Sequence, residues 1–249
     1  MSNIAVITSS IGKETNLLSQ EYTNSADFHA FVDSSKLTSN SSWKTIECVP
    51  YQIEGYFKNR INAKIFKILP FIFLSNYEYF IWLDSNLLLN QDPKFLVNKY
   101  LKKNDIALVK HNKRDCVYDE AKEVIIQRLD FSENIKSQYK YYKSENYPKN
   151  NGLYDCSLRI QRNTEEIKNM SMLWWSQIIQ YSSRDQLSLP FVLSKKNVEP
   201  YVLNSKEDLI TINHVQDTNS RKVENYHNNM FSRRVNLNRN FSLLKKRLK

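Results

Sequence analysis

The stretch Tyr79-Phe80-Ile81-Trp82-Leu83-Asp84 is the strongest indicator of the fold, because five apolar residues in a row end abruptly at a carboxylate. A strand that is apolar on both faces belongs in the middle of a largely parallel sheet, with helices covering both sides. Asp84 follows the strand at its carboxyl end, where open α/β sheets bind their ligands. The stretch therefore predicts an α/β fold with a polar site around Asp84.

The segments on either side alternate between strand and helix patterns. We expect strands over residues 4–8, 28–32, 45–49, 105–109 and 158–161. We expect helices over residues 56–69, 93–103, 117–129 and 165–181, and one more beginning near residue 184, with Ser183 as its cap. Residues 131–152, rich in Tyr, Lys, Asn and Ser, are expected to form a mobile loop or lid. This alternation indicates α/β architecture in a single large domain.

Composition narrows the class of protein. The chain has only 3 Gly in 249 residues, which argues against the glycine-rich phosphate loops of Rossmann and P-loop proteins. Its 3 Cys form no C-x-x-C pair, so structural zinc is not expected and reduced thiols are. Neither a signal peptide nor an apolar run long enough to span a membrane is evident. We therefore expect a soluble, cytoplasmic protein.

The net charge of +10 is concentrated at one end. Residues 219–249 hold nine Lys and Arg against the single acid Glu224, so this tail carries about +8 and residues 1–218 only about +2. The pattern predicts a main domain over 1–218 and a basic tail over 219–249. The tail is either a solvated end or a surface attracted to anionic lipid or an acidic glycan.

Asp84-Ser85-Asn86 is the most informative polar segment. Asp84 and Asn86 offer two oxygen ligands two residues apart, which suits a hard divalent cation such as Mg²⁺ or Mn²⁺. The alternative from spacing alone is that Asp84 caps a turn. Thr8 lies at the carboxyl end of the first expected strand and is a further candidate at the same edge.

The other candidate site residues lie on or beside the expected helices and strands. Arg60 and Lys64 share one helix face and could hold anionic oxygens, or simply form a solvated face. His111 and Arg114 form a polar cluster after the strand over 105–109. Asp185, beside Arg184 at a helix start, is either a general base or an acid favoured by the helix dipole. His214 follows a strand-like run and is a candidate metal ligand.

These segments occur in a recognisable order along the chain. The order is Arg60-x-x-x-Lys64, Tyr79 to Asp84, His111-x-x-Arg114, Tyr118-x-Glu120-Ala121, Trp174-Trp175 and Ser183-Arg184-Asp185-Gln186-Leu187-Ser188. Over roughly residues 4–203 the chain resembles the TOD/MUCI family of glycosyltransferase-like domains. The H-x-x-R…Y-x-E-A and S-R-D-Q-L-S segments are the specific parts of that resemblance.

The resemblance implies a GT-A-type single α/β domain with a mostly parallel, mixed central sheet flanked by helices. It implies transfer of a sugar from a nucleoside-diphosphate sugar to a hydroxyl of a glycan or lipid-linked glycan. Asp84 would take the first position of a D-x-D-type metal motif, with Asn86 in place of the second acid. The nucleotide-sugar would contact Thr8, Arg60, Lys64, Asp84, Ser85, His111, Arg114 and Arg184, and Asp185 would face the acceptor.

Two other functions are weighed against this one. A nucleic-acid-binding protein is disfavoured, because the basic charge lies in the tail while the body is nearly neutral. A non-catalytic glycan- or nucleotide-sugar-binding protein of the same fold stays open, since fold does not fix function and Asn86 departs from the motif.

Overall fold

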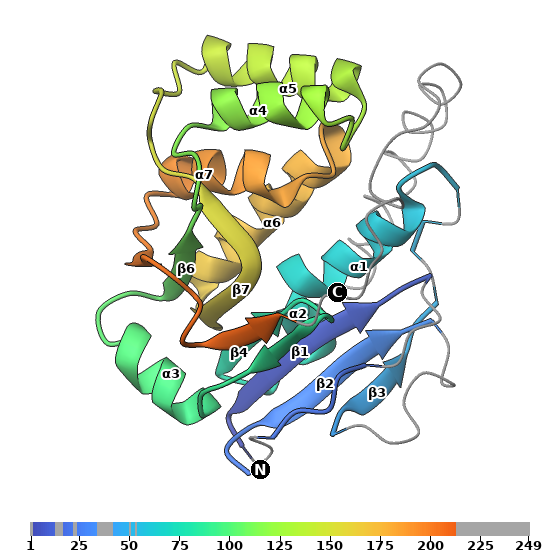
Figure 1. Ribbon diagram of the computed structural model, residues 1–249, viewed down its shortest axis with the longest axis vertical. Helices are drawn as coiled ribbons and strands as arrows, with labels where there is room; N and C mark the ends of the chain where they lie inside the picture. Colours follow the sequence, from blue (N-terminus) through green and yellow to red (C-terminus); the bar gives the residue numbers. More distant parts are fainter. Residues whose placement is uncertain are drawn as a thin grey trace.

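The computed structural model describes residues 2–12, 17–21, 24–33, 42–49, 51–52 and 54–212, and its centre is a seven-stranded sheet (Figure 1). The strand order is β3-β2-β1-β4-β7-β6-β8. The strands are β1 (Ile4–Ser10), β2 (Asp27–Val32), β3 (Lys44–Glu47), β4 (Tyr79–Leu83), β6 (Ile106–Lys110), β7 (Tyr154–Arg162) and β8 (Tyr201–Leu203). All neighbours are parallel except β7, which runs antiparallel to both β4 and β6. The mostly parallel, mixed sheet predicted from the sequence is confirmed.

Strand β4 divides the core into two halves, because successive side chains point to opposite faces. Phe80 and Trp82 pack on one face with helices α1, α6 and α7, while Ile81 and Leu83 pack on the other with α3. The helices are α1 (Lys58–Ile68), α2 (Pro70–Phe73), α3 (Pro93–Tyr100), α4 (Val117–Ile126), α5 (Ser132–Ser144), α6 (Glu165–Gln180) and α7 (Asp185–Lys196). A two-stranded sheet of β5 (Leu87–Leu89) and β9 (Ile210–Ile212) completes the described part.

Local sequence explains several helix ends. The Asp92 carboxylate accepts a hydrogen bond from the Phe95 amide at 3.0 Å, with Pro93 in the first turn of α3. Thr164 caps α6 in the same way through the Ile167 amide. Pro70 has no amide hydrogen to continue α1 and instead opens the short helix α2.

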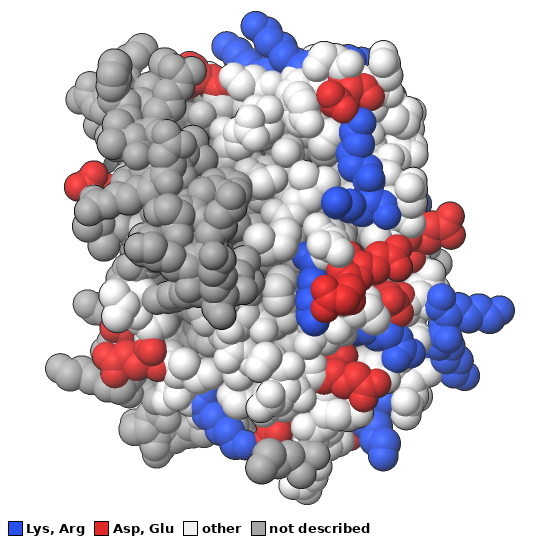
Figure 2. All heavy atoms as spheres, turned by 180° about the vertical axis from the view of Figure 1, so that it is seen from behind, with Lys and Arg blue, Asp and Glu red and all other residues white. Residues whose placement is uncertain are grey.

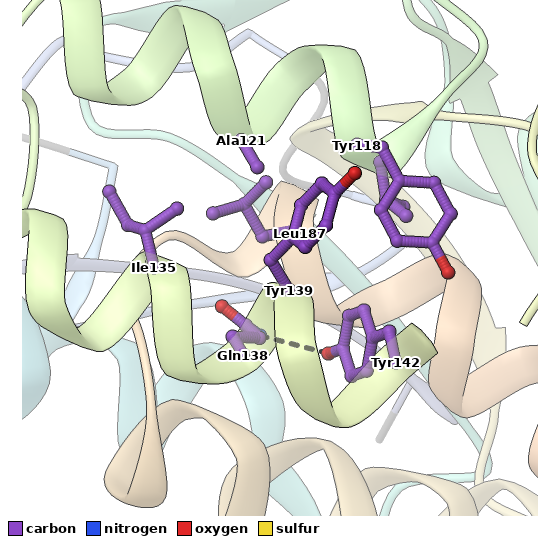
Figure 3. Close-up of a pocket in the computed structure, with 8 residues that line it drawn as sticks. Tyr118, Ala121, Ile135, Gln138, Tyr139, Tyr142 and Leu187 are labelled. Carbon is purple, nitrogen blue, oxygen red and sulfur yellow. Dashed lines mark hydrogen bonds between the residues drawn. The ribbon is translucent and has the colours of Figure 1, made fainter. Parts of the chain in front are cut away.

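The loop or lid expected over residues 131–152 is wrong, because most of this segment is helix α5. Ile135, Gln138 and Tyr142 recur at helical spacing and are buried. The Tyr142 ring stacks on Phe191 of α7 with centroids 4.1 Å apart, so a tyrosine-rich segment obtains its apolar partner from a distant helix. Figure 3 shows the region where α4, α5 and Leu187 of α7 meet. These residues line a small cavity of about 10 Å³, which has room for about one water molecule.

The described surface mixes both signs of charge on the face turned toward the viewer in Figure 2. Lys and Arg side chains there lie among Asp and Glu side chains rather than in one stripe. Among the described residues, no helix is both long enough and apolar enough to cross a bilayer. The basic tail over 219–249 lies outside the described residues, so its role stays a prediction.

Candidate functional site

Asp84 lies where the sequence predicts it, directly after β4 at the carboxyl end of the strand. Its amide donates to the Ser157 carbonyl of β7 at 3.0 Å, and its carbonyl accepts from the Leu87 amide at 2.9 Å. The Trp82 indole donates to Asp84 Oδ1 at 2.7 Å, which orients the carboxylate. The side chain is 40% exposed, so one part of the carboxylate is fixed while the rest faces solvent.

Lys67 of α1 contacts this carboxylate and was not among the residues predicted from the sequence. Its Nζ lies 3.5 Å from Asp84 Oδ1 and 2.8 Å from Asp185 Oδ2, and its side chain is 5% exposed. Burial by itself lowers the pKa of Lys67, but the negative charges of Asp185 and Asp84 outweigh burial and raise that pKa above its ordinary value. Lys67 is therefore a fixed positive charge between two carboxylates.

Asp185, the first residue of α7, is the centre of a buried network. Its Oδ2 lies 2.7 Å from Lys64 Nζ and 2.8 Å from Lys67 Nζ, and its side chain is 7% exposed. Burial tends to raise the pKa of Asp185, but the two lysines lower it well below its usual range. Burial lowers the pKa of Lys64 to about 8, against the opposing effect of Asp185. Lys64, Asp185, Lys67 and Asp84 thus form one row of alternating charge, the Lys64–Asp84 row.

Arg60 and Arg184 lie next to this row but make other contacts. Arg60 Nη1 donates to the Leu129 carbonyl at 2.9 Å and to Ser183 Oγ at 3.2 Å. Arg184 Nη2 donates to Gln186 Oε1 at 3.0 Å. The expectation that Ser183 caps α7 is wrong, because Arg184 is the N-cap residue and makes no side-chain capping bond. Ser183 instead donates a hydrogen bond to the carboxylate of Asp130, which lies between α4 and α5.

His111 and Arg114 form the expected polar cluster after β6. His111 Nδ1 accepts hydrogen bonds from the amides of Lys113 and Arg114, and burial lowers the pKa of its imidazole. Arg114 Nε lies 2.6 Å from the buried carboxylate of Glu120. These bonds join the loop after β6 to α4, so they explain the local fold without involving the Lys64–Asp84 row.

Ser85 and Asn86 occupy the expected edge of the sheet, whereas Thr8 lies inside β1, which continues to Ser10. Thr8 is fully buried at 0% exposure, and its hydroxyl has no hydrogen-bond partner in the described part of the chain. Ser85 and Asn86 are half-buried in the turn between β4 and β5. Their contacts with a nucleotide-sugar stay predictions.

The metal prediction rests on Asp84 and Asn86, since His214 lies outside the described residues. Within those residues, no group of three or more His, Cys, Asp and Glu side chains could by itself hold a metal ion. Mg²⁺ commonly needs only one or two protein carboxylates when substrate phosphates and waters fill its other positions. A half-exposed Asp84 with one oriented oxygen fits a site of that kind.

Lys206, Asp155 and Ser157 form a hydrogen-bonded group beside Asp84, and no sequence motif indicated this group. Lys206 Nζ hydrogen-bonds to Asp155 Oδ2 and to Ser157 Oγ, and Ser157 is the residue whose carbonyl accepts from the Asp84 amide. Burial raises the pKa of Asp155, but Lys206 more than offsets it, so that pKa is lowered. The sequence did contain an indication that Lys67 belongs to the site, because Lys67 lies three residues after Lys64 and so shares its helix face.

The fold and this site define an α/β protein that presents paired cations and carboxylates at the carboxyl ends of parallel strands. Comparison with known sequences gives the particular family: the chain belongs to the TOD1/MUCI70 glycosyltransferase-like domain family, whose profile matches residues 15–227. The resemblance inferred from the sequence is confirmed.

Two known proteins were matched to parts of this chain. The chain is 28% identical over 156 residues to the "Probable hexosyltransferase MUCI70" of Arabidopsis thaliana, an alignment covering 56% of this chain and 26% of that protein. The chain thus matches about a quarter of that relative's length. A crystal structure of a glycosyltransferase involved in the glycosylation of the major capsid of PBCV-1 aligns with a TM-score of 0.45 and 11% identity, over 81% of each chain.

Proposed function

We propose that this protein is a glycosyltransferase that moves a hexosyl or deoxyhexosyl group from a nucleoside-diphosphate sugar to a hydroxyl of a glycan, using a GT-A-type arrangement. The observation that supports it most is the Lys64–Asp84 row at the end of β4, in a chain of a glycosyltransferase-like family. Such a row offers fixed charges to an anionic leaving group and carboxylates to sugar hydroxyls in one place.

Asp84 and Asn86 would hold a divalent cation, Mn²⁺ or Mg²⁺. When bound, the cation would offset negative charge on the departing diphosphate. The Trp82 indole keeps Asp84 oriented before any ligand arrives. Lys67 balances Asp84 from the buried side, and Lys64 supplies a second ammonium whose side chain is 12% exposed.

If Asp185 acts on the acceptor, it could be the general base of an inverting reaction or position the acceptor in a retaining one. A carboxylate held by two ammonium groups with a strongly lowered pKa is a weak base. Its surroundings therefore favour the positioning role, in which Asp185 fixes both lysines and accepts a hydrogen bond from a sugar hydroxyl.

The acceptor and the location of the protein extend this proposal. A lipid-linked glycan acceptor would lie at an anionic membrane, and the basic tail over 219–249 would hold a cytoplasmic enzyme near it as a peripheral protein. Cation binding, acceptor binding and membrane contact can each be tested separately, because the proposal assigns them to different residues.

The test is a screen of nucleoside-diphosphate sugars for transfer or slow hydrolysis, with Mn²⁺, Mg²⁺ or EDTA. Asp84→Asn should nearly abolish turnover and weaken metal-dependent nucleoside-diphosphate binding while the protein stays folded. Asp208→Asn, an exposed acid, is the matched control and should behave as wild type. Binding of a donor without any turnover would favour the non-catalytic alternative, and unchanged binding by Asp84→Asn would remove Asp84 from the site.

A further inference from the structure

Asp130, in the short segment between α4 and α5, is a fully buried carboxylate at 0% exposure. Its Oδ2 accepts hydrogen bonds from Ser182 Oγ at 2.9 Å, from the Ser183 amide at 2.7 Å and from Ser183 Oγ at 2.6 Å. Its Oδ1 accepts from the Phe131 amide at 2.7 Å. A buried carboxylate is costly unless it is well hydrogen-bonded, so the three bonds from Ser182 and Ser183 strongly favour one arrangement of the α6–α7 turn.

This turn is the part of the chain that carries Asp185. Helix α7 begins at Asp185 without a capping side chain from Arg184. Its local side-chain bonds, from the Gln186 amide to Asp185 Oδ1 and from Arg184 to Gln186, lie within the first turn and do not tie that turn to the α4–α5 pair. Ser182 links Asp130 to the start of α7, since its hydroxyl donates to Asp130 and accepts from the Arg184 amide at 3.1 Å. The position of the first turn of α7 is therefore set from outside, by Asp130.

Two further contacts hold the same turn. Arg60 Nη1 bridges the Leu129 carbonyl and Ser183 Oγ, so α1 reaches the turn at Arg60 as well as at Lys64 and Lys67. Leu187 packs into the apolar contact with Ala121 and Ile135, as Figure 3 shows. The start of α7 is thereby held against both α1 and the α4–α5 pair.

We propose that Asp130 is a positioning residue that sets the Ser182–Ser183 turn and thereby keeps Asp185 between Lys64 and Lys67. The proposal rests on the proposed function for its consequence in catalysis, but its geometric part does not. Asp130 touches neither donor nor acceptor; it acts through the serines on the carboxylate that pairs the two lysines.

The first experiment needs no substrate: an NMR titration of the Lys64 side chain in the folded Asp130→Asn variant. The amide keeps the size of Asp130 but cannot accept hydrogen bonds at both of its ends. Lys64 faces Asp185, Lys67 and Arg184, and Asp185 is the anion that holds its pKa up. If Asp185 moves away, the pKa of Lys64 should fall below its wild-type value of about 8. Asp119→Asn, an exposed acid on α4, should leave it unchanged.

The second experiment is a double-mutant cycle on transfer. Asp130→Asn should lower kcat about 10- to 100-fold with little change in donor KM, as expected for a small misplacement at the site. In the Asp185→Asn background the same change should cost less than about 2-fold, because its route of action is already removed. Ser183→Ala serves if Asp130→Asn does not fold, and should shift Lys64 in the same direction by less.

An unchanged pKa of Lys64 in folded Asp130→Asn and Ser183→Ala would overturn the proposal, and so would losses that multiply in the double variant. If no donor is turned over by any preparation, the proposed function fails while the Lys64 titration still decides the role of Asp130.

Discussion

Lys67→Met removes the buried cation that joins Asp185 to Asp84 and replaces it with an apolar side chain of similar length. The ammonium of Lys67 lies 2.8 Å from Asp185 and 3.5 Å from Asp84, and Asp185 is buried. After the substitution Asp185 keeps Lys64 as its one cationic partner in the described part of the chain, together with the Gln186 amide at 3.2 Å, and Asp84 keeps the Trp82 indole. The variant therefore leaves a buried carboxylate with half of its compensation.

The expected loss follows from that geometry. Removing one partner of a buried ion pair typically costs about 3–5 kcal/mol, because the other charge stays buried. Lys64 still pairs Asp185 and Asp84 is partly exposed, so the loss should lie at the lower end, about 3 kcal/mol. For a chain of this size each kcal/mol lowers Tm by about 2–4 °C, which predicts a fall of about 6–12 °C.

The assay is urea denaturation followed by tryptophan fluorescence, with thermal unfolding as a second measure. Lys168→Met, which removes the half-buried partner of the exposed Glu165 on α6, is the control and should change stability by less than about 1 kcal/mol. A Lys67→Met protein as stable as the control variant would refute the reasoning, since it would mean that Asp185 is not a buried charge dependent on Lys67.

Three further predictions test other parts of the molecule. Asp185→Asn should retain donor binding while transfer falls about 10²-fold, as expected for loss of a positioning carboxylate, measured as donor affinity and rate in one preparation; equal losses in both would place Asp185 in the donor site or the fold. The buried His29 ring lies 2.8 Å from Tyr77 Oη, and burial lowers its pKa, so the unfolded chain binds the proton more readily. Stability to urea should therefore fall as pH drops below about 6.5, and less steeply in His29→Gln; identical slopes would contradict this. Deleting residues 219–249 should weaken binding to anionic liposomes and spare donor hydrolysis, whereas equal liposome binding would reject the membrane role of the tail.

Local patterns in the sequence were sufficient to predict those features of the protein that depend on neighbouring residues. The apolar run before Asp84 identified the central strand, because burial on both faces leaves a continuous hydrophobic pattern. Helical spacing identified α1, and Asp92-Pro93 identified the start of α3. The order of the polar segments was enough to recognise the family.

The contacts between those helices and strands became known from the three-dimensional structure. Lys67 and Asp185 are 118 positions apart and Asp130 and Ser183 are 53 apart, so no local pattern relates either pair. Helix α5 was missed for the same reason, since Tyr142 reads as a polar loop residue until Phe191 of α7 covers it. Strand and helix patterns follow from local geometry, whereas pairing of buried charges and aromatic rings depends on which distant segments the fold brings into contact.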